Sequence, residues 1–311
     1  MTLQAWSWLA LFLYVGGMVG FGLLGRSRVR DADDFATARG GYGAIFLGLA
    51  FAATTASGGT FLGFPGLVYE AGLPALWSAV LYPLGVFVGV LLCLRLVARA
   101  GHRFGNRSIP EYLGDRYQSE GIRVLVATAS LLLLFYLAGQ LLSGLVMFEV
   151  LLGLSPATAM AITAVVLLVY VTLGGAHADI LTDGVQGLLM LGIGLMVMVL
   201  FLLGVGVPGG LGGLVDRLAA LDPNAVGWLN PDHPLYRSPW SLFAFFLAHI
   251  PMGLLPHIGN KMWALRGGTQ RWTFAGLVLL FSLILGLLGL GGAHARALLG
   301  DRLFSEGLAS N

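Results

Sequence analysis

Eight apolar stretches, each roughly 20 residues long, restrict the fold of this chain more than any other feature. A stretch of this kind crosses a lipid bilayer as an α-helix, because a helix satisfies its own backbone polar groups. Only 10% of the residues are charged, which is too few to cover the surface of a soluble domain. The sequence therefore predicts an all-α polytopic membrane protein, and it argues against a protein that binds nucleic acid. The expected spans are residues 3–25, 43–69, 75–98, 122–152, 158–175, 180–206, 240–263 and 272–299.

The distribution of cations orients these spans. Thirteen of the 17 lysine and arginine residues fall on one side, in the segments that follow the first, third and seventh spans. The positive-inside rule makes that side cytoplasmic and places the N-terminus outside. The first span has no cation before Arg26, so we expect it to be an uncleaved helix and not a signal peptide. The expected location is the cytoplasmic membrane, with a multi-pass chain embedded in the lipid bilayer.

Two of the eight spans contain helix-breaking residues near their centres. The second span contains Ser57-Gly58-Gly59 and then Gly63-Phe64-Pro65-Gly66, and the seventh contains Pro251, Gly253 and Pro256. In a helix interior, glycine costs about 1 kcal/mol and proline about 3 kcal/mol relative to alanine. Both spans are therefore predicted to unwind. Their freed carbonyl groups, with nearby hydroxyls, are hard oxygen ligands suited to an alkali cation.

The positions of the two breaks favour a transporter. Spans two and seven are five apart, so they cross the membrane in opposite directions, as the first helices of two inverted five-helix repeats would. Interrupted spans in corresponding positions of two halves indicate the binding site of a secondary transporter.

Polar side chains inside the spans supply further candidates. Asp179 and Asp183 lie at the start of the sixth span, and Gln140 lies within the fourth. Carboxylates at membrane depth usually face a cavity or an ion path, whereas acidic groups in a first helical turn also favour the helix dipole. Both interpretations stay open for Asp179 and Asp183. Gln140 either faces the cavity or bonds a neighbouring helix.

In these segments the chain resembles the sodium:solute symporter family, which contains the proline, pantothenate and glucose-type sodium symporters. The similarity runs along nearly the whole chain and in the same order as in the family. The matching motifs are Asp33-Asp34-Phe35, Ser57-Gly58, Gly63-Phe64-Pro65-Gly66, Ser108-Ile109-Pro110-Glu111, Tyr170-Val171-Thr172-Leu173-Gly174-Gly175, Thr182-Asp183-Gly184-Val185-Gln186 and Pro256-His257.

The resemblance implies an inverted-repeat, leucine-transporter-like fold and sodium-coupled symport of a small organic solute by alternating access. It implies that the backbone carbonyls of Ala53 and Ala56 face the sodium ion and that Asp183 matches a carboxylate linked with sodium dependence. Sodium is thus expected as a co-transported ion. By the same resemblance, Ser57 would sit between the ion and the substrate. Together with it, Gly58, Gln140, Met252 and Pro256 are expected to line the substrate site.

Two sequence features indicate which branch of the family, and so which substrate, this chain is closest to. The proline branch has a Trp and a Tyr where this chain has Ala248 and Met252, which argues against proline. Arg116-Tyr117-Gln118-Ser119 is closer to the pantothenate branch. We therefore expect pantothenate or another carboxylate as the solute.

The family pattern also predicts the domain organisation. Residues 1–311 form a single membrane domain, in which 1–25 are an extra first span. Residues 43–206 make the first five-helix repeat, and 240–299 supply the first two helices of an incomplete second repeat. The family has about thirteen spans by resemblance, so the chain is expected to be a fragment that does not hold sodium with normal affinity by itself.

Two alternatives from other classes stay open. Asp179 and Asp183 form a D-x-x-x-D pair, as in membrane prenyltransferases that hold a magnesium-bound diphosphate, although such chemistry needs a second acidic cluster. A channel-like or purely structural, non-transporting membrane subunit is the other alternative. Flux that saturates with substrate would distinguish a carrier from such a subunit.

Overall fold

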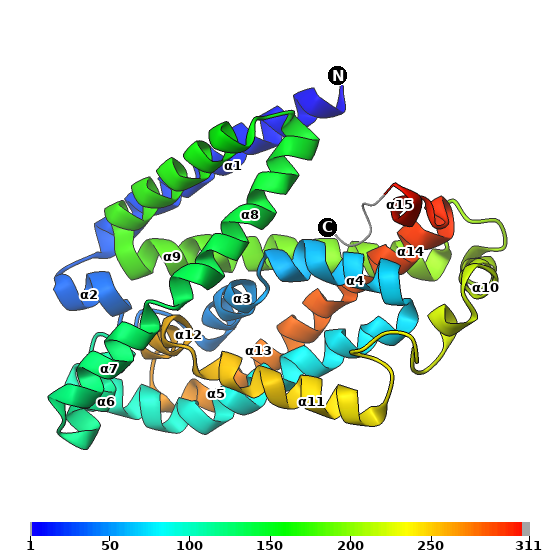
Figure 1. Ribbon diagram of the computed structural model, residues 1–311. Coiled ribbons are helices and arrows are strands. Elements are labelled where there is room, and N and C mark those ends of the chain that lie inside the picture. Colours follow the sequence, from blue (N-terminus) through cyan, green and yellow to red (C-terminus); the bar gives the residue numbers. More distant parts are fainter. Residues whose placement is uncertain (1, 307–311) are drawn as a thin grey trace. The chain divides into compact units, whose positions relative to one another are not determined.

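Figure 1 shows the computed structural model, which describes residues 2–306 without the side chains of residues 98–102 and 254. Within that range every multi-residue element is a helix, and one isolated parallel bridge joins Tyr42 to Leu265. The α-helices are α1 (Leu3–Arg28), α2 (Ala32–Thr37), α3 (Ala44–Thr55), α4 (Phe64–Ala71), α5 (Leu76–Phe104), α6 (Ile109–Tyr117), α7 (Glu120–Ser130), α8 (Leu133–Leu152), α9 (Pro156–Leu203), α10 (Gly210–Leu221), α11 (Pro239–His249), α12 (Pro256–Lys261), α13 (Arg271–Gly286), α14 (Leu290–Leu299) and α15 (Arg302–Ser305).

The long helices match the predicted membrane spans. By length and composition, five described helices can cross a membrane, or seven if each of two bent helix pairs is one span. The 48-residue α9 contains a non-helical residue, Gly175 (φ 50°, ψ −137°). Without this break α9 would be about 72 Å long, more than twice the thickness of the bilayer core. Its two arms correspond to the predicted spans 158–175 and 180–206, and the all-helical, polytopic class is confirmed.

Two details of the spans differ from the prediction. The fourth span is interrupted at Leu131 and Leu132, whose N–H groups donate to carbonyls three residues earlier. The eighth span tightens into a 3-10 turn over Leu287–Gly289, between α13 and α14. Hydropathy does not detect such local changes, because the residues involved stay apolar. A short helix, α10, follows the sixth span.

The described chain divides into two compact units. The first comprises Met1–Thr54, Leu92–Gln186 and Leu255–Phe274; the second comprises Thr55–Leu91, Gly187–Leu254 and Ala275–Asn311. Two of the boundaries lie at the predicted breaks: one after Thr54, just before the first break, and one after residue 254, within the second.

In the first unit, α1 runs beside the first arm of α9 (Figure 1). The approach is close because α1 presents small residues: a Cβ on Gly22 would lie only 3.1 Å from the Cα of Tyr170. Met18 and Tyr170 are buried in the same contact. The first span is therefore packed against the first arm of α9, which also belongs to the first unit.

In the first unit, backbone hydrogen bonds also connect the two interrupted spans at the ends that lie away from their breaks. The N–H of Gly40 donates to the carbonyl of Trp263 at 3.0 Å, and the N–H of Tyr42 donates to the carbonyl of Ala264 at 3.0 Å. The Trp263 side chain is fully buried, and its Nε1 donates to the carbonyl of Val97 at 2.8 Å. The segment just before α3 and the 3-10 turn Met262–Ala264, which follows α12, are thus joined through backbone hydrogen bonds.

Trp263→Phe is expected to lower the free energy of unfolding by about 1 kcal/mol, because it keeps an aromatic ring but removes the hydrogen bond to Val97. Thermal unfolding of the purified protein, followed by tryptophan fluorescence, would measure this. A variant as stable as the native protein would show that this hydrogen bond does not hold α12 in place.

The second unit has its own core around α4, α10 and α14. A Cβ on Gly292 of α14 would lie 1.8 Å from the carbonyl oxygen of Pro65, so the two backbones are in direct contact. The loop before α11 is held to this core: Asn230 donates to the carbonyl of Ala71 at 3.0 Å, and the hydroxyls of Tyr236 and Ser78 are 2.6 Å apart. Burial raises the pKa of Tyr236 to about 12, so its hydroxyl stays protonated.

Candidate functional site

The first predicted break is present in the second span. Helix α3 ends at Thr55, the π-helix η1 (Gly59–Gly63) follows, and α4 continues from Phe64. Single-turn π-helices are rare and often occur at functional sites. The glycine-rich segment that sequence reasoning expected to unwind therefore does interrupt the helix.

The second predicted break is present in the seventh span. Helix α11 ends at His249, the 3-10 helix η4 (Ile250–Leu254) follows, and α12 begins at Pro256 after an extended Leu255 (φ −60°, ψ 142°). Proline explains the break, because Pro256 has no N–H to donate and favours an extended residue before it.

Beside the first break, in the first unit, lies a buried ion-pair cluster. The Lys261 side chain is only 7% exposed; its Nζ is 2.9 Å from Asp179 Oδ2 and is also paired with Asp183 Oδ2. The Thr54 hydroxyl donates to Asp183 Oδ2 at 2.6 Å. The cluster thus joins the end of α3, the second arm of α9 and the last residue of α12.

This cluster carries two carboxylates and one ammonium, so one negative charge is not neutralised by Lys261. Charges at membrane depth persist when they are paired or hydrogen-bonded, and here Asp183 has both an ammonium and a hydroxyl. Asp179 is more open, with 40% of its side chain exposed. The arrangement can attract a cation, and it gives Asp183 a resident positive partner.

A cavity of about 330 Å³ leads to the cluster within the first unit. Its charged and amide lining comes from Asp179, His257, Asn260 and Lys261, and its other walls come from α2 and both arms of α9. The Oδ1 atom of Asn260 is buried and has no hydrogen-bond partner among the described residues. The His257 ring stacks on Tyr136, with centroids 6.1 Å apart. Water or an ion in this cavity would reach Asp179 and Lys261.

A much smaller cavity adjoins the first break in the second unit. It has about 10 Å³ of free volume and is lined by Thr55, Ala56, Thr60, Tyr82 and Ser282 among others. Tyr82 donates to the carbonyl of Thr55 at 2.8 Å. The Oγ of Ser282 is buried without a hydrogen-bond partner in the described part of the chain. The space is about that of one water molecule or one monatomic cation.

The structure distributes the predicted site residues over both units. Asp183 lies in the first unit in contact with Thr54, the residue after Ala53. Ala56 lies in the second unit, beside the unpartnered Ser282. The predicted substrate residues are Ser57 and Gly58 between α3 and η1, Gln140 on α8, Met252 on η4 and Pro256 at the start of α12. Their role in substrate binding stays a prediction.

Sequence reasoning missed the role of Lys261, which it counted among the cations outside the membrane. The structure buries this residue between two carboxylates instead. A signal was present: Lys261 is the only lysine of the chain, and it lies inside the expected span 240–263. An ammonium inside a span requires an anionic partner, and Asp179 and Asp183 were the obvious candidates.

Comparison with solved structures defines the class of fold. The chain resembles a Na⁺-coupled sialic acid symporter, solved in a substrate-bound outward-open state, with a TM-score of 0.57 and 16% sequence identity. The similarity covers 99% of this chain and 74% of that one. The fold is therefore that of this symporter, which confirms the expected leucine-transporter-like class.

The model of the sodium:solute symporter family matches residues 35–305, and the chain belongs to this family. It is 28% identical over 300 residues to the sodium/pantothenate symporter of Escherichia coli K12, covering 94% of this chain and 60% of that protein. It is also 28% identical over 202 residues to the sodium/proline symporter of Salmonella typhimurium LT2, covering 62% of this chain and 39% of that protein. The chain thus spans about 40% to 60% of the length of these relatives. The family is one of transporters and not of enzymes.

Proposed function

We propose that the native protein carries a small organic solute across the membrane by sodium-coupled symport. The observation that carries this proposal is the pair of interrupted helices, α3–η1–α4 and α11–η4–α12, in spans that are five apart. Membership of the sodium:solute symporter family supports it. The prenyltransferase alternative is disfavoured by this family and by the pairing of Asp179 and Asp183 with Lys261.

The sodium ion would bind at the first break. The carbonyls of Ala53 and Ala56 are the expected backbone ligands, and the buried, unpartnered hydroxyl of Ser282 supports a further ligand beside Ala56. These are hard oxygen donors, the type that an alkali cation prefers. Asp183 would attract the ion along its path through the cytoplasmic half of the protein.

Coupling would arise because sodium and solute stabilise the same conformation of the break, so that each raises the affinity for the other. Rocking of one group of helices against the rest would then expose the site inward. One sodium ion moving down a potential of 100 mV contributes about 2.3 kcal/mol, enough for a roughly fiftyfold gradient of a neutral solute. A solute with one negative charge cancels this contribution, so its uptake with one sodium ion is driven by the sodium concentration gradient alone.

The solute we propose is pantothenate or a similar carboxylate. The N-terminal ends of half-helices favour anionic groups, and the segment η1–α4 begins at Gly59, directly after Ser57 and Gly58. The similarity to the sodium/pantothenate symporter, which covers 94% of this chain, supports this choice. Ser57, Gly58, Gln140, Met252 and Pro256 are the proposed contacts.

Uptake by the native protein in proteoliposomes tests the proposal. Labelled pantothenate is expected to accumulate when an inward sodium gradient is imposed, and not when potassium replaces sodium. Unlabelled proline should not compete. Accumulation that does not depend on the sodium gradient would contradict sodium-coupled symport. Sodium-driven accumulation of proline but not of pantothenate would contradict only the choice of solute.

Ser282→Ala is expected to raise the sodium concentration for half-maximal uptake about tenfold, because it removes the contact between the hydroxyl and the sodium ion. A hydrogen bond to a charged group is worth about 1.5 kcal/mol, and we expect a similar value for this contact. The maximal rate at saturating sodium should change little. Ser282→Thr keeps the hydroxyl and serves as the control. An unchanged sodium dependence in Ser282→Ala would remove this residue from the proposed site.

A further inference from the structure

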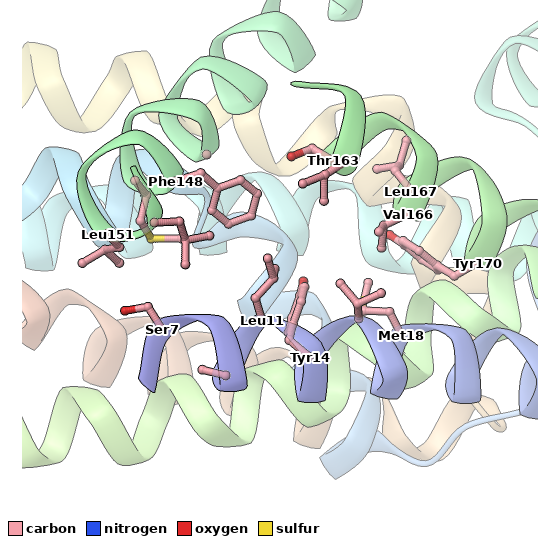
Figure 2. Close-up of a pocket in the computed structure, with 16 residues that line it drawn as sticks. Ser7, Leu11, Tyr14, Met18, Phe148, Leu151, Thr163, Val166, Leu167 and Tyr170 are labelled. Carbon is pink, nitrogen blue, oxygen red and sulfur yellow. The ribbon is translucent and has the colours of Figure 1, made fainter. Parts of the chain in front are cut away.

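A further cavity of the first unit is open on one side and is separate from the cavities described above. It has a volume of about 450 Å³ and is bounded by α1, α8 and the first arm of α9. Figure 2 shows Leu11, Tyr14 and Met18 projecting from α1 toward side chains of the other two helices, among them Phe148 and Val166. None of the proposed sodium or substrate residues lines it.

The lining is suited to an apolar occupant. Most of it is aliphatic or aromatic, and three of its four hydroxyls already take part in hydrogen bonds inside the protein. Ser7 donates to the carbonyl of Leu3, Thr163 donates to the carbonyl of Ala159, and Tyr14 accepts from Gln186. A polar ligand would find few groups to hydrogen-bond, whereas a hydrocarbon gives up no hydrogen bonds when it enters the cavity.

The length of the cavity matches one leaflet of a bilayer. Along α1 the lining runs from Ser7 to Met18, which is about 16 Å at 1.5 Å per residue. Half of the hydrocarbon core is about 15 Å thick. An extended lipid tail spans the same depth, from the headgroup region at the N-terminal end of α1 to the bilayer centre.

The surroundings of the cavity point to lipid as well. On α8, next to the lining residues Met147 and Leu151, the side chains of Leu142, Val146 and Val150 are exposed. On α1, Phe12 and Leu13 are exposed beside Leu11. Hydrocarbon covers apolar helix surfaces of this kind wherever no other helix does, and we expect a lipid tail to reach the cavity from there.

We propose that this cavity binds one acyl chain of a membrane phospholipid. The tail lies between α1 and the pair α8–α9, and it fills space that these helices leave open. The site is independent of the proposed sodium and substrate site, so either proposal can fail without the other.

A photoactivatable lipid tests the site. The native protein is reconstituted in vesicles of phosphatidylethanolamine and phosphatidylglycerol that contain a phosphatidylethanolamine with a diazirine on one acyl chain. After illumination, the label is expected on peptides that contain the lining residues of α1 and α8. Native mass spectrometry should detect a retained phospholipid on the same protein.

Gly144→Phe provides the decisive variant, because Gly144 lines the cavity and a Cβ there meets no atom within 4 Å. The ring should occupy part of the cavity and lower labelling of the α1 peptide about tenfold, the loss expected when roughly two methylene groups of the lipid tail lose their contacts. Gly139→Phe is the matched control: it lies on the same helix, is equally open and does not line the cavity. Both variants should insert and unfold like the native protein.

Three results would overturn the proposal. Equal labelling in the two variants would mean that lipid contacts only the outer surface of the helices. Absence of label from the lining peptides of the native protein would mean that the cavity is empty or covered by another helix. Retention of the phospholipid by Gly144→Phe would place the bound lipid elsewhere.

Discussion

Lys261→Met is expected to lower the free energy of unfolding by about 3–5 kcal/mol, because it leaves a buried carboxylate without its counter-charge. Lys261 is the ammonium that faces both Asp183 and Asp179, and its own side chain is almost fully buried. Sodium-driven uptake should be lost together with stability. Thermal unfolding of the protein in detergent, together with uptake in proteoliposomes, measures both effects.

The double variant Lys261→Met, Asp183→Asn separates the two effects. Removing both charges leaves Thr54 as a hydrogen-bond partner for the new amide, so most of the lost stability should return. Uptake should stay impaired if Asp183 attracts the sodium ion. Arg266→Met is the matched control, because this cation is exposed and donates only to the carbonyl of Gly41; its effect should be below about 1 kcal/mol. A Lys261→Met protein as stable as the native one would contradict the buried ion pair.

Gly89→Ala is expected to destabilise the second unit by about 1–3 kcal/mol or more, although alanine normally favours a helix. A Cβ at this position of α5 would lie 2.1 Å from the carbonyl oxygen of Ile250. On the other side of the contact, a Cβ on Gly253 would lie 2.4 Å from the carbonyl of Val86. The 3-10 segment η4 thus rests directly on the backbone of α5, and neither backbone can move without disturbing the second break.

The control for this variant is Gly276→Ala on α13, where a Cβ meets no atom within 4 Å. That change should leave stability unchanged or raise it by up to about 1 kcal/mol through helix propensity. Opposite signs for the two glycine-to-alanine changes would support the close packing of η4 on α5. Equal stability of both variants in thermal unfolding would contradict it. We also expect Gly89→Ala to slow uptake, because the second break borders the proposed site.

Hydropathy and residue type were enough to predict much of the fold. The eight spans appear as described helices or helix pairs because a bilayer requires about 20 apolar residues per crossing, a local and additive requirement. The two breaks were predictable for a similar reason: Gly58, Gly59 and Pro256 oppose a helix whatever surrounds them. Gly175, which separates the arms of α9, follows the same logic.

Contacts between distant segments could not be obtained in this way. Lys261 and Asp183 are 78 residues apart, and hydropathy treats each as an isolated charge. The backbone contact of η4 with α5 likewise depends on which faces of two helices meet. Such choices are made by packing, because small residues permit close approach but do not specify the partner.

The sequence by itself determined that the chain crosses the membrane repeatedly as helices and that two of its spans are interrupted, since these properties follow from local burial and backbone chemistry. Only the tertiary structure decided that the single lysine lies between two carboxylates and that Ser282 adjoins the first break without a partner. It also decided that α1, α8 and α9 leave a cavity between them whose length is about that of one bilayer leaflet. These features depend on the three-dimensional meeting of segments, where the strength of an interaction is set by distance and by exclusion of water.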